Sequence, residues 1–321
     1  MSRVLLTGAT GAIGAAIVRR LLGDPAYEVR ASDHRPAPRW MREGCEVHAG
    51  DLRELDQARR ATAGCSHVIH LAASAGTDAG AGLLRLPHTL LEVNNALQDA
   101  VIRAAIELDV ERFTYVSSAL VFERATELPT TEAHLPDCPT PRSAAGFSEL
   151  TGEILCRAAH DEHGLQYTIC RPCDPYGPGA VPGPADSVDD LIAQALSGQR
   201  PLRILGTGEQ TRTPTHVEDV AAGIVAAMSS PKGRNEDFNL AAARELSVAE
   251  IAQIVWTACD EDSAELAIEH LECTTPDAAR HWPSVEKIER LLGWRARIEP
   301  EEGIAATVKW FRERGSIGSR Q

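Results

Sequence analysis

Residues 4–14 read VLLTGATGAIG, and this stretch decides the fold. The apolar run 4–7 predicts a buried strand, and the apolar spacing over 13–22 predicts an amphipathic helix. Between them, Gly8, Gly11 and Gly14 give a tight turn whose backbone can approach a pyrophosphate, with the helix N-terminus facing the phosphates. A glycine trio alone is weak evidence. The strand before it and the helix after it make a dinucleotide site the favoured interpretation.

A carboxylate follows at the end of the next predicted strand. Asp33 lies 25 residues after Gly8, where it can accept hydrogen bonds from both ribose hydroxyls of NAD and would repel a 2′-phosphate. Arg35 and Arg39 nearby would weaken that repulsion. We therefore expect NAD rather than NADP as the cofactor.

Short apolar runs alternate with helical patterns over the first 170 residues. This order predicts right-handed parallel crossovers and an α/β fold, a Rossmann-type doubly wound parallel sheet. Such sheets bind ligands beyond the carboxyl ends of their strands. The predicted strands are 4–7, 28–32, 46–49, 67–71, 113–117 and 166–171. The main predicted helices are 13–22, 90–108 and 143–163.

The composition changes at about residue 173, where CDPYGPGAVPGPAD is rich in Pro and Gly and predicts a loop. We expect residues 1–172 to form the NAD-binding domain and 173–321 to form mainly a smaller C-terminal substrate-binding lobe, with 215–240 returning to the first domain. Ser247 and Glu250 predict a capping box at the start of a helix that ends near residue 259. The Gly/Ala-rich segment 74–83 is interpreted as either a linker or a substrate-covering loop.

Composition excludes several classes of protein. The chain is 43% hydrophobic with a net charge of −14. This charge argues against a nucleic-acid partner, because the phosphate backbone binds positively charged protein surfaces. It has no run of 18 apolar residues, so we expect no membrane span. The N-terminal residues enter a predicted strand without a signal-peptide pattern, and we expect a cytoplasmic protein.

Cys170 and Cys173 form the only CxxC among eight cysteines. Zinc would require a second pair or histidines at ligand spacing, and the sequence offers none that is convincing. We therefore predict no metal site. The two cysteines are interpreted as buried or pocket-lining thiols, with a redox pair as the alternative.

Several further segments carry a resemblance to a known family. They include GDLRE (50–54), HLAAS (70–74), VNNALQDAVIRAA (93–105), RFTYVSSALVF (112–122), CRPCDPYGPG (170–179), GTGEQTRTPTHVEDVA (206–221) and EKIERLLGW (286–294). Together with GATGAIG (8–14), they resemble the extended short-chain dehydrogenase/reductase family, in particular its nucleotide-sugar epimerases and dehydratases. The likeness covers nearly the whole chain.

The resemblance implies roles for individual residues. Ser118 is implied as the catalytic hydroxyl, Arg212 as the arginine that holds a nucleotide diphosphate, and Asp174 stands where the family has Asn. All three are expected to contact substrate. The implied cofactor contacts are Gly8, Thr10, Gly11, Ala12, Ile13, Gly14, Asp33, Asp51, Leu52, Leu71, Ala72, Ala73, Asn94 and Ser117. The predicted helices 90–108 and 143–163 resemble the pair that forms a dimer interface in relatives, so we expect a homodimer.

The family's catalytic tyrosine and lysine are missing. In the family the helix after the catalytic serine begins YxxSKxxxE or similar, and the corresponding segment here is AGFSELTGE (145–153). Ser148 and Glu153 fit, but Ala145 stands at the tyrosine position and Glu149 at the lysine position. No tyrosine of the chain has a lysine four residues on, and no lysine precedes residue 232. The absence therefore holds in any register.

This loss matters because hydride removal from a carbinol requires the hydroxyl proton to leave, and a positioned base accelerates that step by roughly 10² to 10⁴. In one hypothesis another residue accepts the proton. Glu149 is the leading candidate, Asp174 is second, and His134 and Cys138 are further possibilities. In a second hypothesis the protein binds NAD or a nucleotide sugar as a regulator or partner subunit. In a third it reduces a different carbonyl compound, since fold does not determine function. We favour the first because Arg212 and the C-terminal lobe are still suited to a diphosphate-linked sugar.

Overall fold

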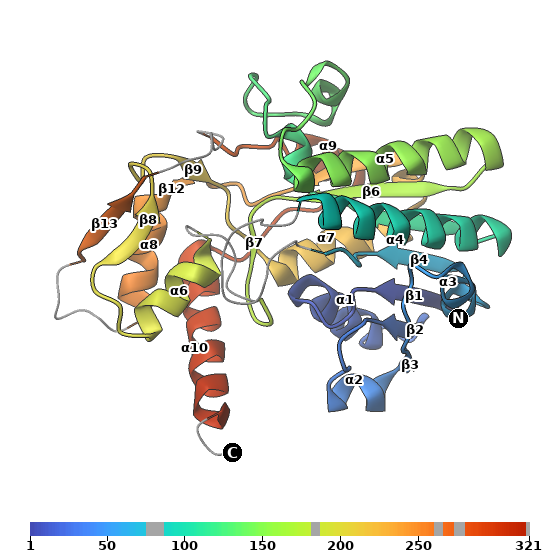
Figure 1. Ribbon diagram of the computed structural model, residues 1–321, viewed down its shortest axis with the longest axis horizontal. Helices are drawn as coiled ribbons and strands as arrows, with labels where there is room; N and C mark the ends of the chain where they lie inside the picture. Colours follow the sequence, from blue (N-terminus) through green and yellow to red (C-terminus); the bar gives the residue numbers. More distant parts are fainter. Residues whose placement is uncertain (75–86, 181–186, 260–265, 273–279, 319–321) are drawn as a thin grey trace.

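The computed structural model describes residues 1–74, 87–180, 187–259, 266–272 and 280–318. At its centre lies a seven-stranded sheet in the order β11-β6-β5-β4-β1-β2-β3 (Figure 1). Every neighbouring pair is parallel, which confirms the predicted α/β fold with a doubly wound sheet. Most of the segment 74–83 lies outside the described residues. The strands are β1 Ser2–Thr7, β2 Tyr27–Ser32, β3 Glu46–His48, β4 His67–His70, β5 Arg112–Val116, β6 Tyr167–Pro172 and β11 Glu236–Leu240.

Helices cover both faces of this sheet (Figure 1). On one face lie α1 (Ala12–Leu22) and α7 (Val217–Ser229), and on the other lie α3 (Leu55–Thr62), α4 (Pro87–Glu107) and α5 (Ala144–His163). Because side chains alternate along a strand, β1 contributes to both cores. Val4 and Leu6 pack with α1 and α7, whereas Leu5 packs with the other three helices.

A smaller lobe follows the sheet. It contains α6 (Val188–Leu196), β8 (Leu202–Leu205), α8 (Val248–Ala258), β13 (Ile268–Leu271) and α10 (Pro300–Gly318). These elements share a core that includes Leu191, Trp256 and Ile304. The predicted capping box is present at the start of α8, where Ser247 and Glu250 bond reciprocally.

Short strand pairs connect the lobe to the sheet. They are β7 (Pro175–Tyr176) with β10 (Thr215–His216), and β9 (Thr211–Arg212) with β12 (Leu246–Ser247). From β10 the chain continues into α7, which packs against α1, and then into β11 at the edge of the main sheet. The remaining helices are α2 (Arg39–Gly44) and α9 (Glu286–Leu292). Among the described helices, none combines the length and apolarity that a membrane crossing needs.

Candidate active site

The glycine turn after β1 is shaped by close packing. A Cβ at Gly14 would lie 2.3 Å from the carbonyl oxygen of Gly8, and one at Gly8 would lie 2.9 Å from the backbone of Leu71. Gly8 also has φ +69°, which glycine adopts without steric strain. A Cβ at Gly11 would meet nothing closer than 3.4 Å. The first and third glycines therefore serve packing, while Gly11 leaves its surface open to a close ligand.

Helix α1 begins at this turn without a side-chain cap. Uncapped amide groups at a helix N-terminus point outward and favour a negative charge. A cavity of about 290 Å³ lies over the turn, and its lining also includes Pro175 of β7 and Gly179 and Ala180 from the loop after β7. The turn thus faces the lobe across a cavity that carries amide donors at its base.

Asp33 is fixed at the end of β2. Its Oδ2 accepts hydrogen bonds from the amide and the hydroxyl of Thr10, at 2.9 and 2.8 Å, and its Oδ1 accepts from the amide of Arg35 at 3.0 Å. Burial alone would raise the pKa of this carboxyl, but these hydrogen bonds hold it below its usual value. The ionised carboxylate therefore lies beside the glycine turn, as its expected role with a ribose requires.

The other predicted cofactor residues lie along the same edge of the sheet. The hydroxyl of Thr7 accepts hydrogen bonds from the amides of Leu71 and Ala72, at 3.1 and 3.0 Å, and so joins the ends of β1 and β4. Asn94 holds the segment after β4, because its side chain bonds both the amide and the carbonyl of Ser74. Ala73 is exposed between these contacts.

Asp51 and Leu52 follow β3 and differ in exposure. The carboxylate of Asp51 pairs with Arg53, while Leu52 is buried in the core formed with α3 and α4. Asp51 is exposed and Leu52 is enclosed by the core, and their contacts with the cofactor stay predictions.

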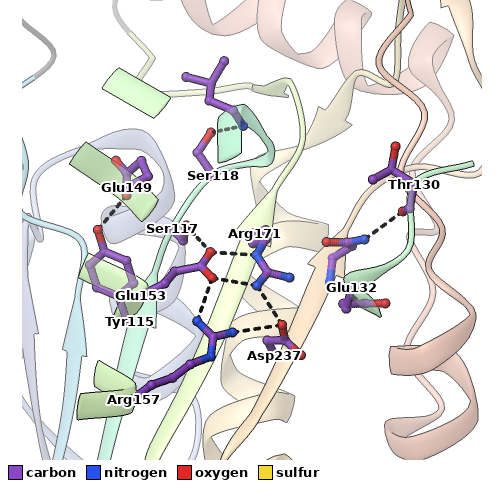
Figure 2. Close-up of polar contacts among 12 residues, drawn as sticks. Tyr115, Ser117, Ser118, Thr130, Glu132, Glu149, Glu153, Arg157, Arg171 and Asp237 are labelled. Atoms are coloured by element: carbon purple, nitrogen blue, oxygen red, sulfur yellow. Dashed lines mark hydrogen bonds and ion pairs between the residues drawn. The ribbon is translucent and has the colours of Figure 1, made fainter. Parts of the chain in front are cut away.

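Ser117 and Ser118 follow β5 but face different partners. The hydroxyl of Ser117 donates to Oε1 of Glu153 at 2.8 Å inside a buried cluster (Figure 2). The Oγ of Ser118 accepts a hydrogen bond from the amide of Leu120 at 3.2 Å and caps a short 3-10 helix, Ala119–Phe122. Ser118 is thus the less enclosed of the two, and its hydroxyl proton has no acceptor among the described residues.

Glu149 projects from α5 toward β5. Its Oε2 accepts a hydrogen bond from the hydroxyl of Tyr115 at 2.8 Å (Figure 2). The side-chain amide of Gln98, from α4, donates to the same tyrosine oxygen at 3.0 Å. Burial and the nearby charge of Glu153 raise the pKa of Glu149 to about 7, although the bond from Tyr115 opposes that rise. Burial holds the pKa of Tyr115 well above its usual range, so the phenol stays protonated.

A buried ion cluster holds α5 against the sheet (Figure 2). Glu153 forms two 2.7 Å bonds with Arg171 of β6, and Arg171 in turn bonds Asp237 of β11 at 2.7 Å. Arg157 pairs with both carboxylates. Glu153 and Arg171 pair where water is excluded, and the cluster fixes the helix that carries Glu149.

Asp174 and Arg212 meet where β6 ends. Oδ2 of Asp174 accepts a hydrogen bond from the amide of Thr213 at 2.9 Å, and Oδ1 lies 3.4 Å from Nδ1 of His281. Burial would raise the pKa of Asp174, but His281 and the charge of Arg212 hold it below its usual value. The two residues that the resemblance assigns to substrate thus lie near each other, although 38 positions separate them.

Comparison with known proteins identifies the family to which the chain belongs. The profile described as "NAD dependent epimerase/dehydratase family" matches residues 4–241. The chain belongs to this family.

Individual relatives agree with this assignment. The GDP-mannose 3,5-epimerase of Arabidopsis thaliana is 28% identical over 97% of the chain and 82% of its own length. DesIV, a dTDP-glucose 4,6-dehydratase of Streptomyces venezuelae solved with NAD bound, is 26% identical with a TM-score of 0.85 over 98% of each chain. The UDP-glucose 4-epimerase of Thermotoga maritima, solved with UDP-glucose, is 25% identical with a TM-score of 0.85 over 97% of the chain and 99% of its own.

Sequence reasoning missed three residues of this region. Tyr115 lies inside the quoted segment 112–122, but only the packing of α5 on β5 brings its hydroxyl to Glu149. Thr213 and His281 come from separate loops that meet at Asp174. A lone histidine in a polar segment gives no signal of such a contact.

Proposed function

We propose that the protein is an NAD-dependent enzyme that epimerises or dehydrates a nucleotide-diphosphate sugar. One observation carries the proposal. The carboxylate of Asp33 and the glycine turn lie at the same edge of the sheet as Ser118, Asp174 and Arg212. In a doubly wound sheet this carboxyl edge is where ligands bind. Family membership and the printed activities of the relatives support the same class of reaction.

NAD fits the first half of this edge, where it would supply a transient hydride acceptor. The fit rests on the open surface at Gly11, on the uncapped start of α1 and on the ionised Asp33. We propose that the glycine turn holds the pyrophosphate and that Asp33 accepts the ribose hydroxyls. Arg212 then donates charge-assisted hydrogen bonds to the diphosphate of the sugar nucleotide. Ser118 and Asp174 contact the sugar.

Glu149 is the proposed proton acceptor in place of the missing tyrosine. A general base works best when its pKa is close to the operating pH. The pKa of Glu149 is raised to about 7, whereas that of Asp174 is lowered and both its oxygens already have partners. Glu149 therefore combines a usable basicity with a position on the helix that the ion cluster fixes. We assign Asp174 to substrate contact and Ser118 to bonding the reacting oxygen.

The test is turnover of defined substrates. The full-length protein is loaded with NAD and incubated with UDP-, GDP-, dTDP- and CDP-linked sugars, and each mixture is followed by NMR. We expect an epimer or an unsaturated sugar from at least one of them. Glu149→Gln should lower turnover by roughly 10² to 10⁴, while Asp174→Asn retains measurable turnover.

Other outcomes decide between the hypotheses. Full activity in both variants would overturn the assignment of Glu149. A nucleotide sugar that raises the melting temperature without being converted would favour a regulator or partner subunit. Absence of NAD binding by calorimetry would overturn the proposal as a whole.

We further propose that the protein works as a homodimer through α4 and α5. These helices pack side by side (Figure 1), and α5 exposes Phe147 and Ile154 to 44% and 56%. Residues seven apart lie on one helix face, so the two form one apolar strip. Ile154→Glu should give a monomer by size exclusion with light scattering, whereas Val47→Glu on the edge strand should not. An unchanged mass in Ile154→Glu would argue against this interface.

A further inference from the structure

Three side chains of metal-binding type converge beyond the end of β6. Cys173, Asp174 and His281 each place one donor atom within 4.8 Å of the other two. Sγ of Cys173 lies 3.5 Å from Oδ2 of Asp174, and Nδ1 of His281 lies 3.4 Å from Oδ1. The histidine comes from a segment 107 residues further along the chain, so no ligand spacing in the sequence indicates this group.

Backbone conformation directs the first two ligands to one side. Consecutive side chains of an extended strand point to opposite faces. Asp174 leaves the strand with φ +42°, a left-handed conformation that few residues other than glycine adopt. This turn brings its carboxylate back to the thiol of Cys173, which is fully buried.

Thr213 contacts all three residues of the cluster and supports two of the ligand groups directly, the carboxylate and the thiol. Its amide donates to Oδ2 of Asp174 at 2.9 Å, and its hydroxyl lies 3.0 Å from Sγ of Cys173. The same hydroxyl lies 3.2 Å from the carbonyl oxygen of His281. Groups that orient ligands in this way are typical of metal sites and strengthen metal binding.

We propose that Cys173, Asp174 and His281 bind a zinc ion through Sγ, a carboxylate oxygen and Nδ1, with the fourth position taken by water or a substrate oxygen. Sulfur, nitrogen and oxygen donors together suit zinc, whereas magnesium and calcium take oxygen ligands. Zinc bonds of about 2.0 to 2.3 Å set tetrahedral ligands about 3.3 to 3.7 Å apart. The separation of 3.5 Å between Sγ of Cys173 and Oδ2 of Asp174 falls in that range, and Nδ1 of His281 lies 3.4 Å from Oδ1, the other oxygen of the same carboxylate.

Charge also balances at this site. Zinc binding displaces the thiol proton of Cys173 to solvent, so the thiolate and the carboxylate of Asp174 together neutralise the ion. The neighbouring Arg212 then faces a neutral group instead of an unbalanced cation. The hydroxyl of Thr213 still donates to the sulfur in this state.

The test measures zinc in the full-length protein. The chain is stripped with a chelator under reducing conditions, titrated with zinc chloride and passed through gel filtration before elemental analysis. We expect one zinc per wild-type chain and none retained by Cys173→Ser or His281→Gln. Thr213→Val should bind about 10- to 100-fold more weakly, since it loses a supporting hydroxyl, and Thr213→Ser should bind like wild type.

Two controls make the result specific. Cys45→Ser and His270→Ala alter a cysteine and a histidine outside the cluster and should retain zinc. Cobalt in place of zinc should give a thiolate-to-cobalt charge-transfer band that Cys173→Ser loses and Cys45→Ser keeps. Should circular dichroism show that Cys173→Ser does not fold, His281→Gln decides, because that side chain is partly exposed.

Wild-type protein that retains no zinc, or equal retention by wild type, Cys173→Ser and His281→Gln, would overturn the proposal. Because the readout is metal content, the outcome is independent of whether the protein converts a nucleotide sugar.

Discussion

The hydroxyl of Tyr115 donates to Oε2 of Glu149 across 2.8 Å, so a strand tyrosine and a helix carboxylate form a pair at the helix position where the family pattern has lysine. That bond favours the ionised form of Glu149, whereas burial and the charge of Glu153 favour the protonated form. Glu149 is therefore poised to take up or release a proton near neutral pH, which an exposed glutamate is not.

Glu149→Gln should stabilise the protein in a pH-dependent way. The folded pKa of Glu149, about 7, lies above its value of 4.5 in a free side chain. The folded state thus binds the proton more tightly, and its stability falls as pH rises through this window. Glutamine does not ionise, so the variant should gain about 1 to 3 kcal/mol over wild type near pH 8 and little near pH 5.

Urea denaturation of both proteins at several pH values measures this difference. Asp189 also has a pKa raised to about 7, but it contributes equally to wild type and variant. A difference in unfolding free energy that does not change with pH would contradict the raised pKa of Glu149.

Tyr115→Phe should raise the pKa of Glu149 further. The phenol bond favours the ionised carboxylate, and hydrogen bonds to charged groups contribute about 1.5 to 3 kcal/mol. The acid limb of kcat/KM should therefore move to higher pH by about one unit, with activity recovered under alkaline conditions. If no substrate is yet in hand, comparing the stability of Tyr115→Phe with that of the Tyr115→Phe, Glu149→Gln double variant across pH gives the same pKa. An acid limb of kcat/KM that does not move would show that the hydroxyl of Tyr115 does not lower the pKa of Glu149.

Asp33→Asn should weaken the preference for NAD over NADP. Asparagine can still accept from Thr10, so the turn remains held, but the charge that repels a 2′-phosphate is gone. The guanidinium of Arg35, whose Nε lies 3.4 Å from Oδ1 of Asp33 in the wild type, becomes available to the phosphate. We expect the ratio of the two affinities by calorimetry to change about tenfold, or about 1.4 kcal/mol. Asp24→Asn, an exposed change just beyond the C-terminal end of α1, is the control and should leave the ratio unaltered.

The sequence predicted the sheet well because its central strands, such as β1 and β4, are buried and contain apolar runs. The run 4–7 and the helix 13–22 correspond to β1 and α1 within two residues at each end. The short helices α2 and α3 were not predicted. The six-residue α2 buries only Met41 and the eight-residue α3 only Ala58, Ala61 and Thr62, so neither contains an apolar run long enough to mark a helix. Strand β13 depends on its pairing with β8 across more than 60 residues, which no local pattern reveals.

The candidate site was predictable only in part, for the same reason. Glu149 could be placed on a helix beside the missing tyrosine position, since that inference needs only local spacing. Its bond to Tyr115 depends on how α5 lies on β5. The meeting of Asp174 with His281 depends on how the lobe folds back on the sheet. We predicted no metal site beside Cys170 and Cys173 because the sequence does not show that His281 lies next to Asp174.

Glu153→Gln should destabilise the protein far more than a matched change at the surface. Glu153 is fully buried and bonds Arg171, Arg157 and Ser117. Removing its charge leaves Arg171 buried with Asp237 as its remaining partner, and breaking such a pair costs about 3 to 5 kcal/mol. Glu28→Gln breaks the exposed pair with Arg3 and should cost less than about 1 kcal/mol. Urea denaturation at neutral pH compares the two. Equal losses would mean that the cluster contributes no more than a surface ion pair, and α5 would then need another anchor to hold Glu149 in place.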